Sequence, residues 1–459
     1  MTTGADERDH GAATPPRRLG RVLGLRDLIF YGIVIIQPIA AVPVFGVADG
    51  LSHGHAVTAV LVAGMAMMLT AVSYGRMAAM YPLAGSAYNY VGRGLNPHLG
   101  FLAGWAMVLD YLVFPVVCVI QVALTVQRLM PAIPYALWVF AFVIVLTAIN
   151  LRGIRTTART NTMLLAFIFV VISIFLVAAV SYLLKKGGLP ELFSARPFYN
   201  PSTFRVGAIA TATSFAALTY LGFDGITTLA EDVKNPRRNV LLATVLVCAF
   251  TTFFSGLLVY LAQVIWPDYR TFPNIETAFM DVTQRVGGSG LFQTMGIAIM
   301  LASLGAGLSG EVAAARLLFA MGRDDVIPRK AFGYLSPNTN TPTFNVLLIS
   351  ALTLIGGLFL NLEHAGELLN FGAFLSFMGV NLASLNQYYF RGLPDVKRRL
   401  FRDALVPIMG FLICLGMWLS LPSLAEIVGG TWFCAGVIYQ AIRTRGFRTQ
   451  PALVIFPDP

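Results

Sequence analysis

The sequence is poor in charged residues, which make up only 12% of its 459 positions. Soluble domains carry about twice that share, so an ordinary soluble domain is excluded. Cysteine is also scarce: the four cysteines stand singly in apolar runs, without the paired spacing of metal sites or disulfide frameworks. The five histidines fall in the tail or in loops, and this argues against an enzyme built inside the membrane.

Long apolar runs take the place of the missing charge. Hydrophobic residues account for 57% of the chain, and its mean hydropathy is +0.73. About 20 apolar residues suffice for a helix to cross a bilayer. The sequence therefore predicts an all-α membrane protein with twelve transmembrane helices, at 27–50, 56–80, 99–127, 132–150, 160–184, 207–230, 239–263, 289–320, 343–361, 367–390, 403–421 and 424–441.

The basic residues predict how the chain is oriented. With an inside amino terminus, 24 Lys and Arg residues fall in cytoplasmic segments, 7 fall outside, and Arg316 lies within a span. Because inner loops collect positive charge, both termini are predicted to be cytoplasmic and the location to be the cytoplasmic (inner) membrane. The net charge of +10 then reflects this bias, and no nucleic-acid partner is expected.

Two of the predicted spans contain residues that interrupt helices. The first includes "YGIVIIQPIAAVPVFGVADG", with Gln37 and Pro38 at its centre, and the sixth includes "LGFDGITTLAED", where Gly222 and Gly225 flank Asp224. Interrupted spans at corresponding positions of two halves are typical of inverted-repeat transporters, whose site lies at the breaks. The alternative is that the prolines merely kink a packing helix.

Four segments carry a family resemblance: "YPLAGSAYNYVGRGLNPHLGFLAGW", "AINLRGIRTTARTN", "LGFDGITTLAEDVKNPRRN" and "ARLLFAMGRDDVIP". In this order they resemble the amino acid, polyamine and organocation transporter superfamily, and "AGSAYNY" with "LDYLVFP" looks most like its putrescine-importer branch. The resemblance implies a five-plus-five inverted repeat with discontinuous helices 1 and 6, alternating access driven by an ion, and a monomer or weak homodimer. Together with the polar composition of the first residues, it divides the chain into a disordered cytoplasmic tail at 1–22, a transport core at 23–392, two added helices at 393–445 and a cytoplasmic tail at 446–459.

The first break departs from the pattern of this superfamily. Its amino acid carriers usually place a small-residue motif there, whose free amides hold the substrate carboxylate. The matching positions here are Ile36, Gln37 and Pro38. Because proline has no N–H group, the carboxylate cradle is weakened, and an ordinary α-amino acid is a less natural substrate.

Three acids within the spans are candidates for substrate binding and for proton coupling: Asp110, Asp224 and Glu311. Ionisable groups at such depth are costly and often functional. Each also has a structural alternative: Asp110 could pair with another helix, Asp224 could organise the unwound turn, and Glu311 could bridge to another helix. Span five lacks the lysine that some proton-coupled relatives use, and sodium remains an alternative ion because Ser303 and Ser309 are available.

The sequence thus predicts a secondary transporter that imports a small cationic, putrescine-like amine with protons. An amino acid importer that uses Gln37, or an uncoupled facilitator or channel, is the alternative. No cofactor or metal is expected beyond the coupling ion, and the partners are a small amine or amino acid and the lipid bilayer. The predicted substrate-binding residues are Ile33, Gln37, Pro38, Ile39, Asp110, Tyr111, Phe215, Leu218, Thr219, Tyr220, Gly222, Phe223, Asp224, Gly310 and Glu311.

Overall fold

The computed structural model describes residues 23–82, 86–152, 158–323, 326–337, 341–392 and 398–449. The predicted tail at 1–22 and most of the one at 446–459 lie outside these residues. The described part is helical, with an isolated bridge between Leu23 and Val233. Its elements are α1 (Leu25–Ile36), α2 (Phe45–Leu51), α3 (Ala56–Met80), α4 (Ser86–Gly94), α5 (Pro97–Leu129), α6 (Tyr135–Leu151), α7 (Ala158–Leu192), α8 (Val206–Ala216), η1 (Ala217–Tyr220), η2 (Phe223–Asp232), α9 (Pro236–Ile265), η3 (Tyr269–Thr271), η4 (Ile275–Thr277), α10 (Ala278–Arg323), α11 (Arg329–Phe332), α12 (Thr343–Phe359), α13 (Leu362–Leu385), η5 (Asn386–Arg391), η6 (Leu400–Leu405), α14 (Val406–Trp418) and α15 (Ser423–Arg443).

Several of these helices are long and apolar enough to cross a membrane. Among the described residues seven qualify, and the number rises to eight when the bent pair Val206–Tyr220 and Phe223–Ala230 is taken as one span. Two shorter apolar helices, Tyr135–Leu151 and Thr343–Phe359, add to them. The chain is a multi-pass membrane protein.

The first predicted span is not one continuous helix. α1 ends at Ile36 and α2 begins at Phe45, with turns between them. Gln37, the C-cap residue of α1, has a positive φ of 64°. The interruption predicted from the sequence is therefore present. Its cause is local, because Pro38 and Pro43 lack the N–H group that would continue the helix.

The sixth predicted span is also interrupted. α8 runs into the 3₁₀ turn η1, and the chain then bends by 42° before η2. Gly222 forms the hinge with a φ of 103°, a conformation that favours glycine. A Cβ atom at this position would lie 2.4 Å from Cγ2 of Ile35, so the two breaks pack against each other.

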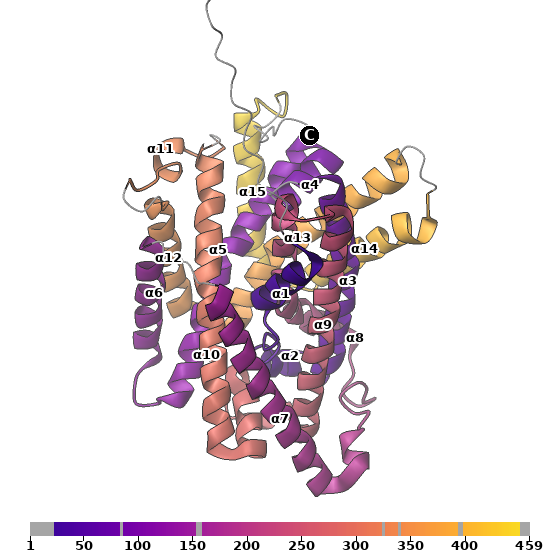
Figure 1. Cartoon of the computed structure of the whole chain (residues 1–459), viewed down its shortest axis with the longest axis vertical. Coiled ribbons are helices and arrows are strands. Elements are labelled where there is room, and N and C mark those ends of the chain that lie inside the picture. The colour runs from indigo at the N-terminus through magenta and orange to yellow at the C-terminus, as the bar shows by residue number, and fades with distance from the viewer. Residues whose placement is uncertain are drawn as a thin grey trace, which may run out of the picture.

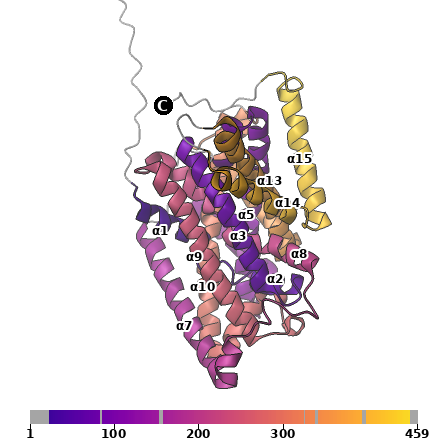
Figure 2. The same cartoon turned by 90° about the vertical axis from the view of Figure 1, so that its right-hand side faces the viewer.

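Small residues allow the long helices to approach closely. A Cβ atom on Gly75 of α3 would lie 2.6 Å from the Cα atom of Leu241 on α9, and one on Gly310 of α10 would lie 2.4 Å from the Phe114 ring of α5. Membrane helices associate largely through such close contacts, because lipid supplies no hydrophobic drive between them. Figure 1 shows α1 and α2 among these long helices, and Figure 2 shows α7 and α15 on opposite sides of the molecule.

The amino-terminal half of the first interrupted region is tied to the carboxyl-terminal half of the second. The Leu23 N–H group donates to the Asp232 carbonyl at 3.0 Å, and the Lys234 N–H group donates to the Leu23 carbonyl at 2.8 Å. Gly32 of α1 faces Ile226 of η2, where a Cβ atom would come within 2.5 Å of the isoleucine side chain. α1 and η2 therefore form one packed unit.

Candidate transport site

A pocket of about 70 Å³ lies beside the first break. Its walls come from the break itself, from α5, from α10, from η1 and from α13. Three predicted site residues line it, namely Gln37, Ile39 and Leu218. The volume is enough for a few water molecules or a small ligand group.

Polar side chains fix one wall of this pocket. Gln37 Nε2 donates to the Ala302 carbonyl at 2.9 Å, which ties the break to α10. Ser303 Oγ donates to Gln121 Oε1 at 3.0 Å, which ties α10 to α5. Phe114 and Ile299 contribute apolar lining. The pocket thus combines an apolar surface with a few fixed amide and hydroxyl groups, as small-molecule sites commonly do.

The acid–tyrosine cluster is a second feature near the breaks, formed by Asp110, Asp224 and four tyrosines. Asp224 is 9% exposed and accepts a 3.5 Å hydrogen bond from Ser86 Oγ of α4. Asp110 interacts electrostatically with Asp224. The tyrosines that interact electrostatically with Asp224 come from four helices: Tyr31, Tyr74, Tyr90 and Tyr111.

The carboxylates of this cluster are not neutralised by a salt bridge within the described residues. The ion pairs of the described residues join Arg76 and Arg402 to Asp403, Arg128 to Asp281 and Lys186 to Glu191, and none of them includes Asp110 or Asp224. Asp224 instead accepts hydrogen bonds from backbone N–H groups of its own turn. The cluster therefore places two acids among tyrosine rings, an arrangement suited to an ammonium group.

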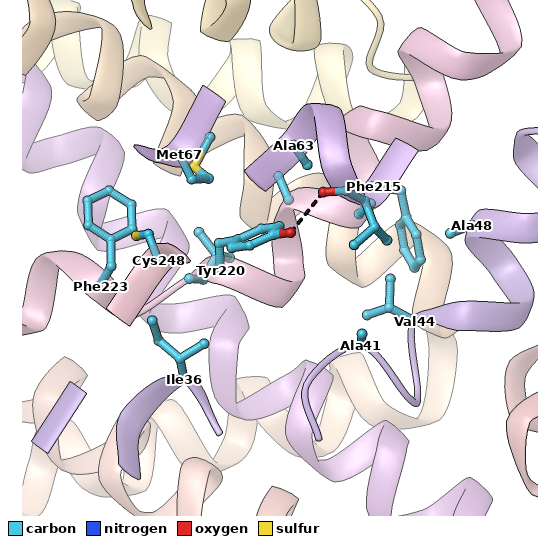
Figure 3. Close-up of a cluster of buried hydrophobic side chains, with 14 of the residues drawn as sticks. Ile36, Ala41, Val44, Ala48, Ala63, Met67, Phe215, Tyr220, Phe223 and Cys248 are labelled. Carbon is cyan, nitrogen blue, oxygen red and sulfur yellow. Dashed lines mark hydrogen bonds between the residues drawn. The ribbon is translucent and has the colours of Figure 1, made fainter. Parts of the chain in front are cut away.

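Most of the predicted aromatic residues are packed in the core rather than around the pocket. Phe215, Tyr220 and Phe223 are fully buried, and Figure 3 shows them among apolar side chains on both sides of the break. The Tyr220 hydroxyl donates to the Val60 carbonyl of α3 at 2.8 Å. The Phe223 ring centroid lies 5.4 Å from that of Tyr74, so Phe223 packs against a tyrosine of the acid–tyrosine cluster.

The remaining predicted positions surround these two features. Gly222 and Pro38 shape the two breaks, and Ile33 packs partly buried on α1. Thr219 is buried in η1 with a hydroxyl that has no hydrogen-bond partner among the described residues. Gly310 lies against the Phe114 ring of α5.

Glu311 faces away from the pocket. It is 2% exposed, and its carboxylate accepts hydrogen bonds from Asn150 Nδ2 and Ser350 Oγ, both at 2.5 Å. Thr147 Oγ1 in turn donates to Ser350 Oγ at 2.8 Å. These contacts join α6, α10 and α12. In the structure Glu311 thus bridges its own helix to two others, as in the structural alternative to a role in proton coupling.

Sequence reasoning did not single out several residues that the structure makes prominent. Gln121 lines the pocket, and Tyr31 interacts with Asp224 from α1. Two further buried acids take part in no ion pair of the described residues: Asp49, which accepts from Gln263 Nε2 at 2.5 Å, and Glu367 of α13. Both acids stand in or next to apolar runs, and that position is the signal by which they could have been found.

The fold and this site define a multi-pass membrane protein with a small internal pocket at interrupted helices. The amino acid permease family matches residues 33–445. The chain is 31% identical to the low-affinity putrescine importer PlaP of Escherichia coli K12, over 94% of this chain and 95% of that protein. It is 25% identical to the methylthioribose transporter of Bacillus subtilis, over 95% of both chains, and 25% identical to the branched-chain amino acid permease BcaP of Lactococcus lactis, over 94% and 96%.

The chain belongs to the amino acid permease family, and the superfamily resemblance seen in its motifs is confirmed. Its relatives are named as transporters of amino acids, of a polyamine and of a sugar derivative. It is therefore a membrane transporter of this family.

Proposed function

We propose that this transporter imports a small cationic amine, putrescine-like in size and charge, by alternating access coupled to protons. The twelve-span fold, with a five-plus-five inverted repeat, a place in the inner membrane and cytoplasmic termini, is part of the same proposal. The observation that carries it is the acid–tyrosine cluster beside the two breaks. Its two carboxylates have no basic partner in the described part of the chain.

The backbone at the breaks supports a cation in preference to a carboxylate. α1 and the α8–η1 segment both end at the breaks, so their carbonyl ends, which carry partial negative charge, face the same region. Pro38 has no N–H group to offer, and the N–H groups of Ala40 and Val42 already donate within the break. Few amides are left to hold a substrate carboxylate.

Asp224 also occupies one of the two helix starts at the breaks, that of η2, the other being the start of α2. It lies in the first turn of η2, and backbone N–H groups of that turn bond its carboxylate. The protein thus supplies its own carboxylate where an amino acid carrier would receive one from the substrate. An amine without a carboxyl group fits this arrangement, and the 31% identity with a putrescine importer supports the same substrate class.

Proton coupling would rest on acids that gain and lose a proton during transport. Asp110 and Asp224 are candidates because they interact with each other and lie close to the substrate path. Glu311 is a third candidate, although its two hydrogen-bond donors favour a role in holding α6, α10 and α12 together. No group in this set is needed for chemistry, because transport forms and breaks no covalent bond.

The test is uptake of radiolabelled putrescine into proteoliposomes under an inward proton gradient. Asp110→Asn and Asp224→Asn are each expected to lower kcat/KM about tenfold or more, since a charge-assisted contact is worth roughly 1.5–3 kcal/mol. Asp268→Asn, an exposed loop acid, serves as the matched control and should transport normally. Glu311→Gln should lower thermal stability and leave selectivity for the amine unchanged.

Unaltered putrescine uptake by both cluster variants would remove the acids from the mechanism. Uptake of a branched-chain amino acid without any uptake of putrescine would favour the amino acid importer instead. Equilibration of putrescine without accumulation under any ion gradient would favour a facilitator or channel.

A further inference from the structure

Glu367 is a buried acid that the proposed transport mechanism does not use. It lies in the second turn of α13 and is 1% exposed. Neither of its carboxylate oxygens has a hydrogen-bond partner among the described residues. A buried polar group without a partner is uncommon, because its desolvation is not compensated.

The turn that carries Glu367 packs against the first half of the interrupted sixth span. A Cβ atom on the preceding residue, Gly366, would lie 2.4 Å from Cδ1 of Leu218 and 3.0 Å from Cε2 of Phe215. Asn370, one turn later, donates from Nδ2 to the Ser214 carbonyl at 2.7 Å. We call this contact between residues 366–370 and residues 214–218 the α13–α8 seam.

The α13–α8 seam adjoins the pocket and contains other polar atoms without partners. Leu369, within the same turn of α13, lines the pocket. Within the seam, the hydroxyl oxygen of Ser214 and the Oδ1 atom of Asn370 are buried and unpaired within the described residues, and so is the hydroxyl of the adjacent Thr213. These groups can accept or donate a hydrogen bond, but none carries a positive charge.

The ionisable groups near this turn do not offset a negative charge. Glu363, one turn earlier on α13, repels the carboxylate of Glu367. α8 has no ionisable side chain, and η1 has Tyr220. Glu276 of η4 accepts a 2.9 Å hydrogen bond from the Leu362 N–H group at the start of α13, and α5 brings Asp110, where a Cβ atom on Gly372 would lie 3.2 Å from the Asp110 backbone nitrogen. Cys414 of α14 lies further along α13, beside the Thr70 hydroxyl that Asn381 also contacts, and Glu426 lies in the first turn of α15. α3 and α4 meet α13 several turns further on, at Phe377 and Gly379.

An ionised Glu367 would therefore be a buried charge without a partner, a state that costs several kcal/mol. A bound proton removes that charge without needing additional space. The neutral carboxyl group would have an O–H donor. Asn370, one turn later on α13, has an unpaired Oδ1 atom, and an amide oxygen can accept such a hydrogen bond.

We propose that Glu367 is a proton-binding site of the transport cycle, protonated while the α13–α8 seam is closed and deprotonated when the seam opens to water. The proton passes between the Glu367 carboxylate and water, so no other reactant is needed. Because the closed seam binds more protons than the open one, lower pH favours closure. The inference deepens the proton coupling put forward above and rests on it.

Glu367→Gln tests this role, because glutamine has nearly the same shape and cannot take up a proton. The variant is expected to exchange labelled for unlabelled putrescine at the wild-type rate and to lose accumulation driven by a pH gradient. Glu363→Gln is the control on the same helix: it removes a nearby charge but leaves Glu367 able to take up a proton, so accumulation should persist, with its pH dependence displaced toward lower pH. Wild-type accumulation by Glu367→Gln would overturn the inference.

A second measurement does not depend on transport. Infrared spectra of the purified protein near neutral pH should contain the carbonyl band of a protonated carboxylic acid that is absent in Glu367→Gln and present in Glu363→Gln. Identical spectra of wild type and Glu367→Gln would overturn the inference. Should wild-type protein show no pH-driven amine uptake, the proposed function fails, while the infrared band still decides whether Glu367 holds a proton.

If Glu367→Gln does not fold, Glu367→Asp takes its place. Aspartate keeps an ionisable carboxyl group on a shorter side chain, so accumulation should persist with a shifted pH profile. A purely structural role for Glu367 would lower the amount or stability of Glu367→Asp protein and leave its pH profile unchanged, which would contradict the inference.

Discussion

Single residues set the geometry of the two helix breaks. Pro38 and Pro43 remove two N–H groups from the first break, and Gly222 allows the left-handed turn of the second. The close approach of Gly222 to Ile35 joins the two breaks, so a change at one of them is transmitted to the other. The conformation of this glycine is therefore tied to the shape of the site.

Gly222→Ala is expected to strain the second break. Alanine at a φ of 103° costs about 1–3 kcal/mol, and its Cβ atom would also meet Ile35 at 2.4 Å. Thermal unfolding in detergent should show a lower midpoint, and uptake should fall. Gly430→Ala is the control: it lies in α15, and no atom stands within 4 Å of the added Cβ atom. Equal effects of the two substitutions would contradict the assignment of strain to the break.

Pairs of elements are joined by buried polar contacts. Arg76 of α3 is 4% exposed, and its guanidinium donates to Asp403 Oδ1 at 2.6 Å and to the Arg402 carbonyl at 2.7 Å. It also stacks on the Tyr388 ring, 3.7 Å from its centroid. This one side chain thus holds α3 against η5 and η6, and through them against the start of α14.

Asp403→Ala is expected to destabilise the protein by about 3–5 kcal/mol, because it leaves the Arg76 charge buried without its partner. The measurement is the free energy of unfolding from chemical or thermal denaturation in mild detergent. Glu191→Ala breaks the exposed pair with Lys186, 3.2 Å long, and is expected to change stability by no more than about 1 kcal/mol. Similar losses in both variants would show that Arg76 is not held as described.

The sequence predicted features that depend on local chemistry. The two interruptions follow from the proline after Gln37 and from Gly222. Proline lacks an N–H group and glycine tolerates a positive φ, and both effects are local, so they do not depend on how the helix packs. Glu311 and Arg316 stand five positions apart, which is about 140° around a straight helix, so the sequence alone places them on different faces, and the structure has Glu311 buried and Arg316 exposed. These predictions needed no knowledge of neighbouring helices.

Features that depend on the rotation of one helix against another could not be predicted in this way. Tyr220 is an aromatic residue next to the second break and was predicted to bind substrate, yet its hydroxyl donates to the Val60 carbonyl of α3. Glu311 and Gly310 are adjacent in sequence but face different helices, α6 and α12 for one and α5 for the other. The sequence does not reveal the positions of Gln121 and Glu367. Helix packing alone brings Gln121 to the pocket, and helix packing alone leaves the Glu367 carboxylate without a hydrogen-bond partner among the described residues.

At the scale of the whole molecule, the two interrupted spans lie within a frame of long helices. α1 and η2 are linked by the Leu23 hydrogen bonds and by the contact of Gly32 with Ile226, so they can move as one unit. The α13–α8 seam and the hydrogen bond of Gln37 to the Ala302 carbonyl connect the breaks to the helices around them. In the proposed alternating-access cycle, these are contacts that a movement of the breaks would have to change.

The central claim is that the site holds an amine rather than an amino acid, and competition for uptake tests it most directly. Wild-type proteoliposomes take up labelled putrescine in the presence of excess unlabelled putrescine, of a diamine of different length, or of leucine. The account predicts that the diamines compete and that leucine does not, because the breaks offer carboxylates and carbonyl ends but few free amides. Competition by leucine without competition by the diamines would contradict it.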